Sequence, residues 1–313
     1  ISKPTPADIE YLRAEYQFHP LDLEDCIGRI QRPQISEYPH YLFFILTFPF
    51  YDRKNKVIES SEIDFFIGPK YLITISDGLT QVVDNFFHDM KKNDYSQDQY
   101  MQDHPVFLLY EILHRLQNYT MPMLDHVNHD IEEMEHNIFA GKEKIVAKEI
   151  LNIKRNIVNL RKIMQAHKNI IKKLMASNTK VFMPNNTQIY FSNILDRTKD
   201  IWDILETQKE NISAFQEANE SLMSYKLNEI IRVLTIISVV LMPANLLAVI
   251  FGMKSEATPI VGARFDFYII ISLMLVIMTG LLSYFKKKDW LWFLPTQLLS
   301  AINNPNFPIG IFE

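Results

Sequence analysis

The stretch "VLMPANLLAVIFGMKSEATP", residues 240–259, combines an apolar, helix-like run with a proline, an asparagine and a lysine near its end. It completes an uncharged segment, 233–251, and a second uncharged segment covers 267–285. At about 1.5 Å of rise per helical residue, either segment covers roughly the 30 Å hydrocarbon core of a bilayer. We therefore predict two transmembrane helices, 229–252 and 267–285, joined by an extracytoplasmic loop, 253–266.

The average composition hides this concentration of apolar residues. The chain has 313 residues, of which 48% are hydrophobic and 22% are charged, and its formal net charge is -5. Everything before about residue 225 is polar enough for an aqueous environment, so we expect a large soluble part followed by the two spans. The single Cys26 excludes an intrachain disulfide and fits a reducing compartment.

Charges beside the two spans predict their orientation. Lys226 and Arg232 precede the uncharged segment 233–251 of the first span, and the cluster Lys286 to Lys288 follows the second span. Positive residues concentrate on the cytoplasmic side of membrane proteins, so both termini are expected in the cytosol. The chain starts without Met, so we also expect residues upstream of Ile1, and the lack of a charged-then-apolar leader pattern predicts that the large N-terminal part is not exported. The sequence thus predicts a multi-pass protein of the cytoplasmic (inner or plasma) membrane, surrounded by lipid.

The soluble part begins with helix and strand patterns in the region 1–140. Runs rich in β-branched and aromatic residues, separated by the turn-like "YDRKNK" and "GPK", are typical of consecutive strands. These runs are 41–48, 61–68 and 71–76. Apolar residues at helical spacing flank them in 6–17, after His19-Pro20, and in 79–92. We therefore expect a cytosolic α/β layered domain and the start of a helical layer over 1–140.

The following part of the chain has the composition of very long helices. No glycine occurs between Lys142 and Phe251, and only two prolines interrupt this stretch. We predict helices over about 105–139 and 142–176, a break at "NTKVFMPNN", and a third helix from Thr187 that ends in the membrane at Gly252. Isolated helices owe little stability to propensity alone, so these are expected to form a bundle.

A stripe with a heptad-like spacing runs along the first span. Its members follow one another by alternate steps of three and four and include every polar side chain of the span. They are Asn228, Ile231, Thr235, Ser238, Met242, Asn245, Val249 and Gly252. Polar side chains are disfavoured against lipid, so this face should contact protein or water. Either a ring of identical copies turns the stripe inward around a pore, or the stripe packs against the second span. Two asparagines at opposite ends favour the pore.

The sequence "NEIIRVLTIISVVLMPANLLAVIFGMKSE", followed by a second span and "YFKKKDWL", resembles the CorA family of magnesium transport proteins. The signature of that family is Gly-Met-Asn at the outer end of the first span. The segments "FHPLDLEDCIGRIQRPQ", "YDRKNKVIESSEIDFFIGPKYLITI" and "YFSNILDRT" are also similar to CorA segments. The resemblance therefore covers nearly the whole chain, except for the tail after Leu291.

The resemblance implies an α+β multidomain membrane protein that assembles as a homopentamer. Each subunit would have a cytosolic α/β/α funnel domain, a helical stalk over 141–228 that continues into the pore-lining span, and a basic cluster with a cytosolic tail over 286–313. Hydrated divalent cations, Mg²⁺ and also Co²⁺, would pass down the axis into the cytoplasm under control of intracellular Mg²⁺.

The resemblance also implies roles for residues of the first span. Asn228 would form a ring around the hydrated ion at the cytosolic end, and Asn245 a second polar ring. The hydrophobic constriction would consist of Ile231, Leu234 and Met242, where Leu234 falls just beside the stripe. Such an apolar ring gates because Mg²⁺ gives up its waters reluctantly and a dry throat offers no replacement.

The outer loop departs from the family signature. The motif is Gly252-Met253-Lys254, and lysine offers hydrogen-bond donors and a charge but no acceptor. A ring of five such ammonium groups would repel an entering cation, and Glu256 is the expected counter-ion. This loop is the predicted selectivity loop.

The regulatory metal site that the resemblance implies also differs from the family pattern. In the family, a carboxylate of the funnel domain and one of a neighbouring stalk helix share Mg²⁺. Asp25 matches the first position, but the second position is Asn193. Asp196, about one turn further along the helix, is the candidate substitute.

One further motif carries metal-binding residue types. The sequence "DHVNHDIEEMEH" places His126, His129, Glu133 and His136 at a spacing that suits a transition metal, although a solvated acidic helix is the simpler interpretation. No Gly-rich phosphate loop, catalytic triad signature or basic nucleic-acid face is apparent, so we expect no enzyme, no organic cofactor and no nucleic-acid partner.

The function expected first is a CorA-type channel for divalent cations, chiefly Mg²⁺. One alternative is a CorA-fold transporter of altered selectivity, zinc-type or anion-tolerant, with Lys254 as the cause. Another is a non-conducting membrane cation sensor.

Overall fold

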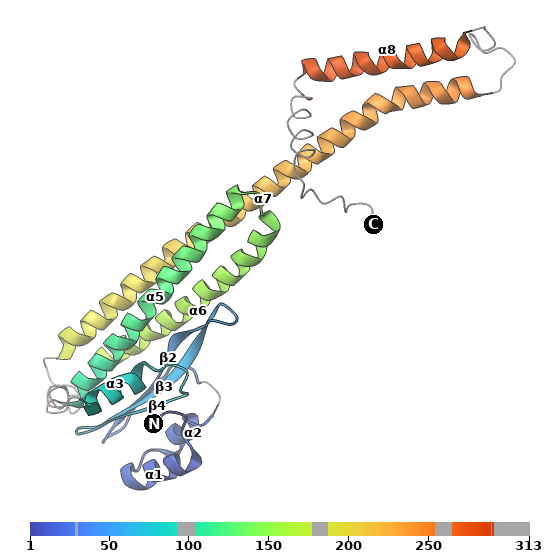
Figure 1. The fold of residues 1–313 in the computed structure, drawn as a ribbon. Coiled ribbons are helices and arrows are strands. Elements are labelled where there is room, and N and C mark those ends of the chain that lie inside the picture. Colours follow the sequence, from blue (N-terminus) through green and yellow to red (C-terminus); the bar gives the residue numbers. More distant parts are fainter. Residues whose placement is uncertain (29–30, 93–103, 177–186, 254–264, 289, 291–313) are drawn as a thin grey trace. The chain divides into compact units, whose positions relative to one another are not determined.

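The structure, a computed structural model, describes residues 1–28, 31–92, 104–176, 187–253, 265–288 and 290 (Figure 1). The chain forms two compact units, Ile1–Glu220 and Ser221–Glu313. The first unit contains the sheet and the long helices that follow it, and the second contains the two apolar spans.

A four-stranded antiparallel sheet in the order β1-β2-β3-β4 forms the centre of the first unit. The strands are β1 (Ile35–Glu37), β2 (Leu42–Asp52), β3 (Val57–Ile67) and β4 (Leu72–Ser76). The central strands β2 and β3 pair along their whole length, from Leu42 with Ile67 to Asp52 with Val57. The three predicted strands are confirmed, and β1 is an additional short strand at the sheet edge.

The β2–β3 hairpin is longer than the sequence predicted. The turn expected over "YDRKNK" is shorter, because Asp52 still belongs to β2 and β3 begins at Val57 rather than at Ser61. The Asp52 side chain closes this tight turn: its Oδ1 accepts a hydrogen bond from the Lys54 backbone N–H at 2.9 Å, and its Oδ2 accepts one from Asn55 Nδ2 at 2.6 Å. Asp and Asn stabilise turns by such local bonds.

Different helices cover the two faces of the sheet, because successive side chains of a strand point to opposite faces. Phe43 and Phe66 pack on one face against α1 and α2, and Phe44 and Phe65 pack on the other against α3 and the long helices. The three short helices are α1 (Pro6–Tyr16), α2 (Pro20–Asp25) and α3 (Val82–Lys92). The first unit therefore has the α/β/α layering that the sequence predicted.

Three long helices complete this unit: α5 (Pro105–Phe139), α6 (Glu143–Ala176) and α7 (Gln188–Gly252), of which only α7 continues into the second unit. These bounds confirm the three predicted long helices to within one residue. Figure 1 shows α5, α6 and the first part of α7 side by side. The predicted break at "NTKVFMPNN" lies outside the described residues.

Buried polar side chains set the position of α7 against α5. Gln117 of α5 donates from Nε2 to the carbonyl oxygen of Ile194 at 3.0 Å and to the hydroxyl of Thr198 at 2.8 Å. About three turns further on, Gln208 of α7 donates to the carbonyl oxygen of Leu124 at 3.0 Å. Buried polar groups that lose such partners destabilise a fold, so these bonds disfavour a sliding of one helix along the other.

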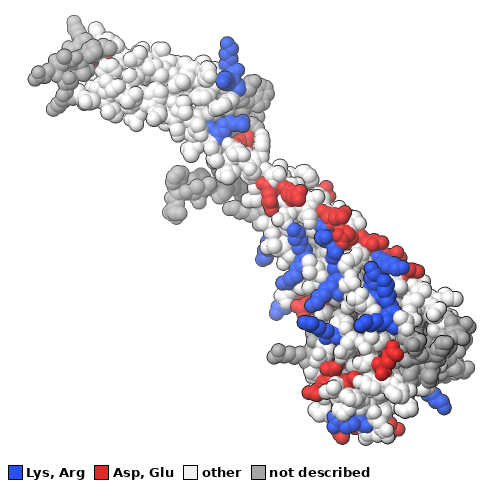
Figure 2. All heavy atoms as spheres, turned by 180° about the vertical axis from the view of Figure 1, so that it is seen from behind, with Lys and Arg blue, Asp and Glu red and all other residues white. Residues whose placement is uncertain are grey.

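The second unit contains the end of α7 and α8 (Asp266–Lys287). Both helices are long and apolar enough to cross a membrane. On the face drawn in Figure 2 their surface between the ends carries no Lys, Arg, Asp or Glu. This unit therefore has the composition that a lipid environment requires.

Candidate functional site

The stripe of the first span lies on an exposed face of α7. Met242 is exposed to 74%, Leu234 to 63% and Val249 to 58%. The remaining predicted pore residues, Asn228, Ile231, Thr235, Ser238 and Asn245, are exposed as well. Large apolar and polar side chains thus share one face that the described part of the chain leaves uncovered.

The opposite face of this span packs against α8. Ile236 and Val240 are exposed to only 2% and 5% and form an apolar cluster with Phe285 of α8. A helix turns by about 100° per residue, so Ile236 lies about 200° around the axis from Ser238, and Val240 lies about 200° from Met242. In the described chain the second span therefore contacts an apolar face, and the alternative in which the polar stripe packs against it does not hold.

The two hydroxyls of the stripe bind to their own helix. Thr235 Oγ1 donates to the carbonyl oxygen of Ile231 at 2.7 Å, and Ser238 Oγ donates to that of Leu234 at 2.9 Å. Each hydroxyl oxygen keeps lone pairs that are free to accept a further hydrogen bond. The stripe can therefore present acceptors to water without leaving a donor unsatisfied.

The outer end of α7 is described only as far as Met253. The Met253 N–H donates to the carbonyl oxygen of Ile250 at 3.4 Å, and its side chain is exposed to 63%. A Cβ at Gly252 would meet nothing within 4 Å, so packing inside one chain does not demand a glycine there. Lys254 and Glu256, the other two residues of the predicted selectivity loop, lie outside the described residues.

The predicted regulatory metal ligands lie on opposite sides of the sheet. Asp25 ends α2, which covers one face, whereas Asn193 and Asp196 lie on α7, whose neighbouring Phe191 and Ile194 pack on the other face. One chain therefore does not bring the two sides of this site together. A cation bound by both has to lie between different copies of the chain.

Each of these three side chains has a polar partner of its own. Asp25 Oδ2 accepts a hydrogen bond from Gln34 Nε2 at 2.8 Å, and Asn193 Oδ1 accepts one from the Tyr110 hydroxyl at 3.4 Å. Asp196 pairs with Lys199 at 2.8 Å on the exposed surface. The long bond of Asn193 and the exposed pair of Asp196 are weak interactions that a cation can replace.

A group of buried acids between α2 and the sheet was missed by the sequence reasoning. Asp64 is exposed to 2%, and burial raises its pKa to about 8, with the nearby Glu62 carboxylate as the next cause. Burial also raises the pKa of Asp22, which accepts hydrogen bonds from the hydroxyls of Tyr41 and Tyr38. The only available signal was Glu62 and Asp64 at alternate positions of a predicted strand, which places both on one face.

In the described part, no group of three or more His, Cys, Asp or Glu side chains is placed to hold a metal ion. His126, His129, Glu133 and His136 are exposed on α5.

An α/β/α domain and long helices, together with two helices that are long and apolar enough to cross a membrane, define a class of protein: a helical membrane protein with a large domain outside the spans. Residues 1–287 match the family model described as CorA-like Mg²⁺ transporter protein. The chain belongs to this family, whose members are transporters and not enzymes.

Individual relatives agree in sequence and in fold. The chain is 27% identical over 276 residues to the cobalt/magnesium transport protein CorA of Thermotoga maritima, covering 88% of this chain and 78% of that protein. It is 21% identical over 275 residues to the protein of the same description from Methanocaldococcus jannaschii, covering 86% and 83%. The complete structure of the CorA magnesium transporter from Methanocaldococcus jannaschii has a TM-score of 0.80 at 19% identity, covering 92% of this chain and 89% of that chain. The predicted family is thereby confirmed, and so is the predicted fold of the single chain, whereas the homopentamer stays a prediction.

Proposed function

We propose that this chain forms a homopentameric channel that passes hydrated Mg²⁺, and Co²⁺ as a second ion, into the cytoplasm. The observation that carries the proposal is the exposed stripe of α7, which lies opposite the apolar contact with α8. Polar side chains within a span require protein or water as neighbours. A ring of identical copies with the stripe inward supplies water, and cyclic symmetry closes such a ring.

The stripe residues have two roles in this channel. The amides of Asn228 and Asn245 bind the water shell of the ion, because an amide offers both donors and an acceptor. Ile231, Leu234 and Met242 form the constriction, which blocks a hydrated ion as long as the throat is dry. The hydroxyls of Thr235 and Ser238 line the passage between Leu234 and Met242, and the side chain of Val249 lines it between Asn245 and the outer end of the span.

Intracellular Mg²⁺ closes the channel in this proposal. It binds between Asp25 of one subunit and Asn193 or Asp196 of the next. This arrangement is supported by the position of these residues on opposite sides of the sheet within one chain. Asn193 and Asp196 lie on α7, the same helix that carries the constriction. Loss of the bound ion loosens the subunits, and the throat then widens and fills with water.

The membrane orientation follows from the flanking charges. Lys226 and Arg232 before the uncharged segment of the first span, and the cluster Lys286 to Lys288 after the second span, place both termini in the cytosol. The loop with Gly252, Met253, Lys254 and Glu256 then faces outward and forms the entrance. The second span contacts lipid around the ring.

The test is ion uptake by the purified full-length protein in liposomes loaded with an ion-sensitive dye. Parallel samples receive Mg²⁺, Co²⁺, Zn²⁺ or chloride at equal ionic strength, and protein-free liposomes are the control. We expect saturable Mg²⁺ uptake, slower Co²⁺ uptake and no chloride uptake. Mg²⁺ uptake no faster than in protein-free liposomes would refute the channel, and faster Zn²⁺ or chloride uptake would refute the assigned selectivity. Native mass spectrometry of the same sample tests the pentamer.

A further inference from the structure

A groove between α6 and α7 in the first unit gathers three basic side chains. It has a volume of about 330 Å³, and Lys154, Arg161 and Lys209 line it together with an apolar wall that includes Ile157 and Val158. Small-molecule sites have volumes of roughly 300–1,000 Å³ and combine apolar walls with a few charged groups. The groove therefore has the size and the lining of a ligand site.

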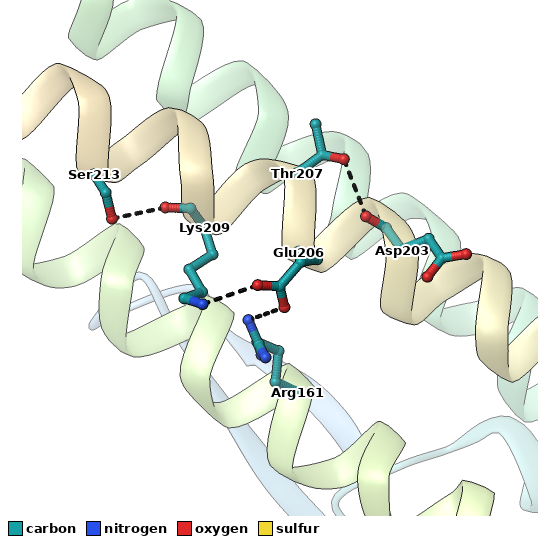
Figure 3. Close-up of polar contacts among 6 residues, drawn as sticks. All are labelled: Arg161, Asp203, Glu206, Thr207, Lys209 and Ser213. Atoms are coloured by element: carbon teal, nitrogen blue, oxygen red, sulfur yellow. Dashed lines mark hydrogen bonds and ion pairs between the residues drawn. The ribbon is translucent and has the colours of Figure 1, made fainter.

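One carboxylate holds two of the three cations in place (Figure 3). Glu206 Oε1 accepts a hydrogen bond from Lys209 Nζ at 2.9 Å, and its Oε2 pairs with Arg161. The hydrogen bond from Lys209 and the nearby Arg161 charge lower the pKa of Glu206, so this carboxylate stays ionised. Both of its oxygens are in use, and the three cations together with Glu206 leave a formal charge of about +2 in the groove.

Two further contacts orient the side chains of Lys154 and Arg161. Lys154 donates to the amide oxygen of Gln216, a neutral group that does not cancel its charge. The Arg161 guanidinium lies 4.7 Å from the centroid of the Trp202 ring, a cation–π distance. The cations of the groove are thus arranged before any ligand binds.

The positive charge at the groove comes from its α6 wall, because the first part of α7, up to Glu220, carries more Asp and Glu than Lys and Arg. α6 contains seven Lys and two Arg but only two Glu. Figure 2 shows Lys and Arg gathered in a band along the helical part of the first unit, beside a row of Asp and Glu. A concentration of one charge sign beside a cleft attracts ligands of the opposite sign.

We propose that this groove binds a small organic phosphate of about nucleotide size. Phosphate oxygens accept hydrogen bonds from Lys154, Lys209 and Arg161, the charge-assisted type that favours phosphate. The organic part covers Val158, which is exposed to 62% in the chain, whereas Ile157 beneath it is exposed to only 1%. An inorganic anion satisfies the cations but leaves the exposed Val158 side chain in water, which is why an organic phosphate fits better. The site is independent of the ion pathway.

The test uses Trp202 as a reporter in the full-length protein, with Trp290 and Trp292 replaced by Phe. ATP, AMP and pyrophosphate are titrated without Mg²⁺ at constant ionic strength, and calorimetry on the unmodified protein measures the same affinities independently. We expect saturable binding of ATP, at least tenfold weaker binding of pyrophosphate, and about tenfold weaker ATP binding in Lys154→Gln and in Lys209→Gln.

The matched control is Arg155→Gln, which removes an exposed cation from the next position of α6, outside the groove lining. It should leave the ATP affinity unchanged. Absence of saturable ATP binding in calorimetry overturns the proposal. An equal loss in Arg155→Gln and Lys154→Gln also overturns it, because binding is then a general attraction to α6. Pyrophosphate binding as tightly as ATP overturns the role of the apolar wall.

Discussion

Replacement of Met242 by asparagine tests whether the exposed stripe is the constriction. The side chain is exposed to 74% in the chain, so it makes few contacts there and its replacement should cost little folding stability. Leu241 is the matched control, since it is exposed to 51% at nearly the same depth but points about 100° away around the helix. Met242→Asn and Leu241→Asn therefore introduce the same side chain at nearly the same depth in the membrane, and they differ in the direction in which that side chain points.

The magnitude follows from the number of copies in the proposed ring. Each new amide can bind water in the throat, and one such hydrogen bond contributes about 1 kcal/mol net. Five copies give an upper limit of about 5 kcal/mol, and less than a third of this amount already changes a rate tenfold. We therefore expect Met242→Asn to raise Mg²⁺ flux at least tenfold under closed-state conditions, and Leu241→Asn to change it less than about twofold.

The assay is Mg²⁺ flux into liposomes with high internal Mg²⁺, normalised to the amount of inserted protein. Size-exclusion chromatography of each variant checks that the assembly is intact. The constriction is not at Met242 if its variant conducts like the wild type. The same conclusion holds if both variants raise the flux equally, because the effect then does not depend on the direction of the side chain.

Three further predictions concern regulation, stability and the entrance. Asn193→Asp adds a charge to the proposed regulatory site, so less Mg²⁺ should protect the protein from protease; an unchanged protection curve would contradict the role of this position. Burial raises the pKa of Asp64 to about 8 in the folded protein, above the ordinary value of 3.8 that we expect in the unfolded chain. At a pH between these two pKa values, the folded state binds one proton that the unfolded state has lost. The free energy of unfolding should therefore fall as pH rises from about 4 to about 8, by at most about 1.4 kcal/mol per unit, and Asp64→Asn should remove this slope in denaturant titrations at pH 5, 7 and 9. If the slope is the same in Asp64→Asn, the carboxyl is ionised when folded. Lys254→Asn should raise Mg²⁺ uptake about tenfold, since five ammonium groups at ~10 Å repel the ion by ~1.5 kcal/mol after screening, and Glu256→Gln should reduce uptake. Equal uptake by wild type and Lys254→Asn would show that the lysine points away from the axis.

The sequence by itself determined the elements and the two spans. The absence of glycine between Lys142 and Phe251 and the apolar periodicity allowed the long helices to be placed within one residue, because these signals are local. The β2–β3 hairpin was predicted too short, because the side-chain bonds of Asp52 that close its turn are not visible in a pattern of apolar residues. The family could also be recognised from the sequence, because its motifs are short local stretches of the chain.

Tertiary structure decided which faces are buried. Helical periodicity puts the polar residues of the first span on one side, but it does not say which side the second span occupies. That choice depends on how Ile236 and Val240 fit against Phe285, a contact between residues far apart in the chain. The burial of Asp64, and the separation of Asp25 from Asn193 by the sheet, also result from contacts between residues far apart in the chain. Burial is a property of packed surfaces, and the sum of many such contacts cannot be obtained from the order of residues along one strand or helix.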